Sequence, residues 1–144
     1  DGLTRAVLDS YAERVLTAVF AILHSGKGLQ ATLAALIDFA STDPRMETGC
    51  LFYKMRAGKH RHGPETLAHV EEIDAAARSA YAAFFQSARD TVDFPDALPV
   101  EAATCLGEQL GLAITQRASG EDSARIREMT TMALSVFTRR EWPA

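Results

Sequence analysis

The sequence of 144 residues is 47% hydrophobic and 24% charged, a balance that favours a folded domain and excludes an intrinsically disordered chain. Its 15 basic and 19 acidic residues give a net charge of −4, so the chain lacks the positive excess typical of a nucleic-acid-binding surface. Cys50 and Cys105 do not form a CxxC pair, and no signal-like apolar segment opens the chain, so we expect free thiols in the cytoplasm. No apolar run approaches the roughly 18 residues that a membrane span needs.

Apolar residues recur at helical spacing along the chain and never alternate strictly, which predicts an all-α domain over residues 1–144. A long first helix over 3–22 ends at the glycine-containing turn 25–28, and a second helix covers 29–40. Asp43 and Pro44 are expected to cap and begin a third helix. This helix should be central to the domain, because it is apolar on nearly every side through Cys50, Leu51, Phe52, Tyr53 and Met55.

Three further helices are predicted after the polar segment 57–64. The fourth is long, begins at Pro64 and ends near residue 90, and the fifth follows the segment 93–99. Ser119 and Asp122 resemble a capping box before the sixth helix, which continues to Phe137. The short connections predict one compact helical domain.

Enzyme signatures are missing from the chain. There is no GxSxG, HExxH, phosphate-loop or dinucleotide-binding pattern, so no enzymatic activity, cofactor or metal is expected. His60 and His62 fit a solvated basic loop better than a metal site, and His24 suits the last turn of its helix, where the helix dipole favours positive charge. Cys50 is either a small core residue or the thiol of a redox switch.

Two further patterns each allow two interpretations. Aromatic residues from three helices, with Gln109 as a polar group, suit either a ligand pocket or a core. The fifth helix carries Gly107 and Gly111 in a stripe of small residues, although each mid-helix glycine costs about 1 kcal/mol relative to alanine. Close packing by a helix of the same chain or by a partner subunit would compensate this cost.

Two segments resemble the TetR family of transcription regulators. The first segment, DGLTRAVLDSYAERV, is similar to the one that follows the DNA-binding head of that family, and DPRMETGCLF resembles its "dpr…GCL" helix. The resemblance extends along the whole chain to the final ALSVF helix.

This resemblance implies a ligand-responsive repressor whose helix-turn-helix head lies upstream of Asp1, outside this chain. The chain itself would be a six-helix regulatory domain that binds a small, mostly apolar effector and forms a homodimer. Its last two long helices would form an intersubunit four-helix bundle, and Gly49 would let the central helix pass close to a neighbour. The effector would contact Phe39, Cys50, Tyr53, Tyr81, Phe84, Phe85, Gln109 and Leu110. The dimer interface would comprise Thr104, Gly107, Gly111, Thr115, Ala118, Thr130, Leu134 and Phe137.

A protein of another class fits the same pattern. A stand-alone helical module without a role on DNA could use the same cavity for a lipid or a partner helix. In either case, we expect no membrane association.

Overall fold

A computed structural model describes residues 2–47, 49–90 and 99–135, and every element in these ranges is helical. The helices are α1 (Gly2–Leu23), α2 (Leu29–Thr42), α3 (Leu51–Ala57), α4 (Pro64–Asp90), α5 (Pro99–Ala118) and α6 (Ser123–Leu134). Two 3₁₀ turns, η1 (Pro44–Met46) and η2 (Lys59–Arg61), flank α3. The all-α prediction is therefore confirmed for the described residues.

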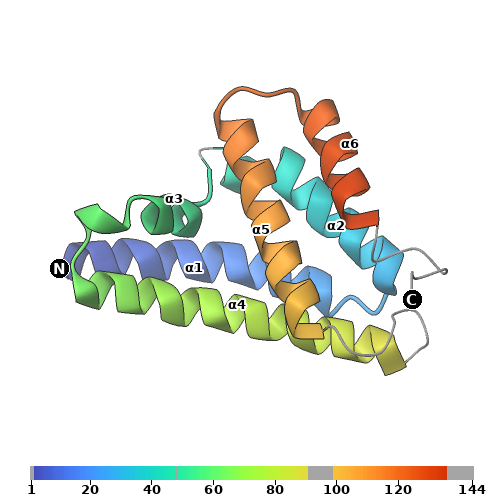
Figure 1. Cartoon of the computed structure of the whole chain (residues 1–144), viewed down its shortest axis with the longest axis horizontal. Coiled ribbons are helices and arrows are strands. Elements are labelled where there is room, and N and C mark those ends of the chain that lie inside the picture. The colour runs from blue at the N-terminus through green and yellow to red at the C-terminus, as the bar shows by residue number, and fades with distance from the viewer. Residues whose placement is uncertain (1, 48, 91–98, 136–144) are drawn as a thin grey trace.

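The helices form two connected groups (Figure 1). α1 and α4 lie side by side in the same direction along the long axis of the molecule, and α3 packs against α4. α5 crosses α4 and forms the second group with α2 and α6, both of which it contacts. This arrangement leaves the end of α1, the start of α2 and the second half of α4 close together.

Residues from all six helices contribute to one cluster of buried hydrophobic side chains. Its largest members with almost no exposed surface include Leu8 of α1, Leu36 of α2, Phe85 of α4, Leu106 of α5 and Ile126 of α6. α3 contributes Phe52 and Met55. Burial of these side chains is the main stabilising contribution, at about 1.5–3 kcal/mol for each one.

Glycine explains where α1 ends and α2 begins. Gly26 has φ of 71° and Gly28 has φ of 90°, backbone conformations that L-residues with a side chain rarely adopt. The chain leaves α1 at the turn expected from the sequence and starts α2 at Leu29. None of the described helices combines the length and hydrophobicity required to cross a bilayer.

The third predicted helix is wrong in extent and position. Asp43 does act as a cap, because its Oδ1 accepts a hydrogen bond of 2.9 Å from the Arg45 amide, but it caps only the turn η1. Gly49 then takes φ of 100°, which no α-helix accommodates, so α3 begins only at Leu51. Lys54 is exposed on α3, so this short helix lies at the surface instead of being surrounded by core.

Gly49→Ala is expected to destabilise the chain by about 1–3 kcal/mol, because a Cβ would be forced into a positive-φ conformation. The added Cβ would also lie 2.8 Å from Cε of Lys54 and 3.4 Å from Cβ of Ala118. Urea unfolding monitored by circular dichroism measures the change. Gly63→Ala is the matched control, since a Cβ there meets no atom within 4 Å, and equal stabilities of the two variants would contradict the prediction.

The start of α6 also differs from its predicted capping box. The Asp122 carboxylate accepts a hydrogen bond of 3.1 Å from the Arg125 amide and is the N-cap of α6. The Ser119 hydroxyl instead donates to the Thr115 carbonyl of α5, at 3.1 Å. A single aspartate cap therefore replaces the two-residue motif that we expected.

Two tyrosines of the core hold their hydroxyl groups away from water. The hydroxyl of Tyr11 is buried, and its ring packs edge-on against Phe52 with centroids 5.0 Å apart. Burial raises the pKa of both Tyr11 and Tyr81, and the neighbouring Cys50 adds to this effect. Both phenols therefore stay protonated in the folded chain at a pH where exposed tyrosines ionise.

The stability of the chain is expected to fall as the pH rises above about 10, the ordinary pKa of tyrosine. In this range the unfolded chain releases tyrosine protons that the folded chain retains, so the unfolded state binds fewer protons and the free energy of unfolding decreases with pH. Each tyrosine contributes a slope of up to about 1.4 kcal/mol per pH unit. Urea unfolding at several pH values measures the slope for the wild type and for Tyr81→Phe, and an unchanged slope in the variant would contradict this assignment.

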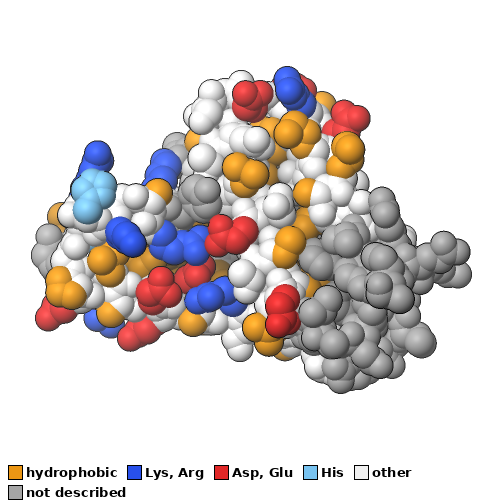
Figure 2. Space-filling view, viewed as in Figure 1, with side chains coloured by type: hydrophobic (Ala, Val, Ile, Leu, Met, Phe, Trp, Pro, Cys, Tyr) orange, Lys and Arg blue, Asp and Glu red, His pale blue; other side chains and the backbone are white. Residues whose placement is uncertain are grey.

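Among the described residues, large hydrophobic side chains are exposed at Val100 of α5 and in two further regions. Leu3 and Val7, one turn apart on α1, are 77% and 51% exposed. The second region comprises Leu112 of α5 with Met129 and Met132 of α6, and Figure 2 shows hydrophobic side chains on the face of the molecule over these two helices. We refer to Leu112, Met129 and Met132 as the α5–α6 patch.

Candidate ligand pocket

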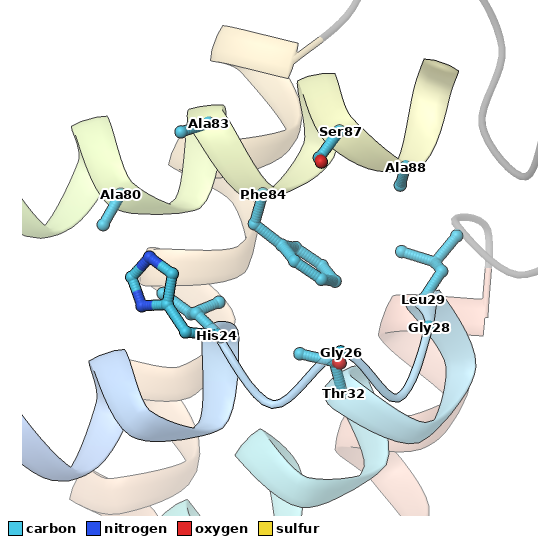
Figure 3. A pocket seen from close by; sticks show the side chains of 11 residues that line it. His24, Gly26, Gly28, Leu29, Thr32, Ala80, Ala83, Phe84, Ser87 and Ala88 are labelled. Atoms are coloured by element: carbon cyan, nitrogen blue, oxygen red, sulfur yellow. The ribbon is translucent and has the colours of Figure 1, made fainter. Parts of the chain in front are cut away.

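A pocket of about 420 Å³ lies between the end of α1, the turn that leads into α2, and the second half of α4 (Figure 3). This volume falls within the range of small-molecule sites in proteins. The apolar part of its lining consists of Leu23, Leu29, Ala80, Ala83, Phe84 and Ala88, and the rest consists of His24, Gly26, Gly28, Thr32 and Ser87.

Small residues on both walls explain why space remains here. α4 presents alanines and Ser87 to the pocket, and the opposite wall is the turn that contains Gly26 and Gly28. Phe84 is the one large aromatic residue of the lining and projects from α4 into the space between the two walls (Figure 3). The sequence requires glycine in this turn for its backbone conformation, and the missing side chains leave the pocket open.

The pocket is apolar and contains a few polar groups. None of the described lining residues is Asp, Glu, Lys or Arg. Thr32 is buried, whereas His24 and Ser87 are exposed. Such a lining suits an uncharged organic molecule whose orientation is fixed by one or two hydrogen bonds.

His24 is held in one orientation by its own helix. Its Nδ1 lies 2.8 Å from the carbonyl oxygen of Phe20, one turn earlier in α1. Because a carbonyl oxygen only accepts, Nδ1 must carry the hydrogen, and in the neutral imidazole Nε2 is then an acceptor. The expected role of His24 at the helix end agrees with this bond, but its place in the pocket was not predicted.

The structure places the eight predicted effector residues in several environments. Phe84 lines the pocket. Phe39, Tyr81, Phe85 and Leu110 are buried in the core, and Cys50 and Gln109 are half-buried outside the pocket lining. The side chain of Tyr53 lies outside the described part of the structure. The aromatic set that allowed two interpretations is thus mainly core, with one member at the pocket.

The predicted dimer residues are divided in a similar way. Thr104 and Ala118 are exposed, and Gly107 and Thr115 are half-buried. Gly111, Thr130 and Leu134 are buried within the chain, and Phe137 lies outside the described residues. A Cβ on Gly107 would lie 3.8 Å from Cε2 of Tyr81, so this glycine faces α4 of the same chain. A subunit contact on this side would therefore use the exposed α5–α6 patch instead of the buried residues.

The cysteines and histidines of the described residues form neither a disulfide nor a metal-binding group. Cys50 and Cys105 are free and half-buried, and burial raises the pKa of the Cys105 thiol. Among the described residues, no group of three or more His, Cys, Asp or Glu side chains could hold a metal ion.

Comparison with known proteins identifies no relative: no family model, no curated protein and no solved structure matches this chain. The fold and the site define an all-α chain with a pocket of ligand size. Any narrower assignment depends on the sequence motifs and on the geometry of the pocket.

Proposed function

We propose that this chain is the effector-binding and dimerisation domain of a ligand-responsive repressor of the TetR type. The observation that carries the proposal is the position of the pocket at the end of α1. Leu23 and His24, at the end of this helix, line the pocket, and α1 extends from there along α4 to the opposite end of the molecule (Figure 1). A ligand at one end of α1 can therefore bias the position of its other end.

The exposed residues on α1 suit this role. Leu3 and Val7 lie far along α1 from the pocket and present apolar surface to solvent. In a repressor of this type, they would contact the DNA-binding head. The effector would act by binding more tightly to the arrangement of helices in which the two heads do not fit DNA, because a ligand without such a preference shifts no equilibrium.

A substitution that narrows the pocket tests whether a ligand binds there. Ala80 lines the pocket, and its side chain points toward His24 (Figure 3), so Ala80→Leu should reduce the affinity for a small aromatic probe such as toluene at least tenfold. Ala76→Leu, at an exposed position of α4, is the matched control and should bind as the wild type does. Isothermal titration calorimetry measures both, and equal affinities in the two variants would show that the probe does not use this pocket.

The role on DNA is tested with the native protein in its own cells. Chromatin immunoprecipitation should enrich a small number of promoter fragments if the protein is a repressor. Absence of any enriched DNA would favour the alternative, a stand-alone helical ligand-binding module, which the pocket supports equally well.

A further inference from the structure

The chemistry of the pocket limits the charge of its ligand. Apart from His24, whose neutral form carries no charge, no described lining residue has a side chain that could pair with a charged group. Transferring a carboxylate or an ammonium group from water into an apolar site without a partner is strongly unfavourable. An uncharged molecule therefore fits the lining better than an acid or an amine.

The lining also favours a flat, aromatic ligand. The Phe84 ring projects into the pocket and is half-buried, so part of its surface is free to contact a ligand. The opposite wall is the side-chain-free surface of Gly26 and Gly28, which allows close approach of a planar ring. Aromatic rings that pack edge-to-face or offset gain about 0.5–1.5 kcal/mol beyond the burial of their area.

One polar atom in the pocket has a defined hydrogen-bonding role. Since the Nδ1 hydrogen of His24 is donated to Phe20, the neutral ring presents Nε2 as an acceptor. The His24 ring and the Phe84 ring both project into the space between α4 and the α1–α2 turn (Figure 3). A ligand that packs against Phe84 and donates a hydrogen bond to His24 would satisfy both groups.

We propose that the pocket selects a neutral phenol, an aromatic ring with a hydroxyl group, and that His24 is the residue that distinguishes it from other aromatic compounds. The phenol O–H donates to Nε2 of His24, and the ring packs against Phe84. This inference rests on the proposed function, because it names the ligand class of the same pocket.

The experiment compares phenol with its methyl ether anisole, a probe of similar shape, and with benzoate as a charged probe, by isothermal titration calorimetry on the 144-residue chain. Only phenol can donate a hydrogen bond, so it should bind about three- to tenfold more tightly than anisole. His24→Phe keeps an aromatic ring but removes the acceptor, and it should reduce this ratio to about one. His60→Phe, at an exposed position in η2, is the control and should keep the wild-type ratio.

A second measurement does not depend on a variant. In the wild-type chain with ¹⁵N-labelled histidine, saturating phenol should shift the Nε2 resonance of His24, and anisole should not.

Equal affinities of the wild type for phenol and anisole would overturn the inference while leaving the pocket as a site for aromatic compounds. Tighter binding of benzoate than of phenol would overturn it as well. If none of the three probes bound, both the phenol inference and the assignment of this pocket as the effector site would be overturned. The role on DNA is tested separately by chromatin immunoprecipitation.

Discussion

Phe85→Ala is expected to lower the free energy of unfolding by about 3–5 kcal/mol, the cost of removing a large aromatic side chain from a closed core. Phe85 has no exposed surface, and it lies in α4, the helix that contacts α1, α3 and α5. Its ring is tilted against that of Phe84, with centroids 5.5 Å apart. Few groups near the centre of such a core can move to fill the cavity, so the loss should fall in the upper part of the usual range for core truncations.

The neighbouring residue provides the matched control. Phe84 is half-buried and lines the pocket, so Phe84→Ala should cost less stability, about 1–2 kcal/mol, and should weaken the binding of aromatic probes. Urea unfolding of both variants gives the comparison, with the denaturant slope checked for two-state behaviour. If Phe85→Ala were as stable as Phe84→Ala, Phe85 would not have the central packing role that its burial indicates.

This pair of residues shows what the sequence could and could not predict. Spacing placed both phenylalanines on the inner side of one helix, and that is where they lie. Two adjacent residues point about 100° apart on a helix, and only the packing of neighbouring helices decides which one meets the core and which one meets a cavity. The pocket was not predicted for the same reason, because alanines that line a cavity and alanines that allow tight packing have the same spacing.

Local chemistry was predicted more successfully than long-range packing. The turn at Gly26 and Gly28 and the cap at Asp43 depend on residues within four positions of one another, although the predicted capping box of Ser119 and Asp122 is replaced by a cap from Asp122 alone. Gly49 was interpreted as a residue that lets the central helix pass close to a neighbour, whereas its φ of 100° excludes it from a helix. The pattern of the small-residue stripe of α5 allowed packing within the chain or against a partner subunit, and the TetR resemblance implied the second; the structure turns Gly107 toward Tyr81 of α4 of the same chain.

Met132→Glu is expected to abolish self-association of the chain at micromolar concentration, if the proposed homodimer forms through the α5–α6 patch. Met132 is 70% exposed, and Met129 and Leu112, at 46% and 42%, complete an apolar surface on the two helices that the TetR resemblance assigns to the dimer. In a two-fold dimer each substitution occurs twice in the same interface, so it removes two apolar contacts and introduces two buried charges. At about 1.5–3 kcal/mol for each buried methionine, the apolar loss alone weakens the dimer by at least a hundredfold.

Sedimentation equilibrium measures the dissociation constant of the wild type and of the variants. Met132→Leu keeps the apolar surface and should leave the dimer within about threefold of the wild-type affinity, as volume-conserving exchanges are usually tolerated. Leu3→Glu introduces the same charge at another exposed apolar position, on α1, and should not affect a dimer built on α5 and α6. If Leu3→Glu dissociated the dimer and Met132→Glu did not, the subunits would associate through α1, and the methionines would be free for a different partner. A wild-type chain that stayed monomeric at 100 µM, about a hundredfold above a micromolar dissociation constant, would remove dimerisation from the proposed function.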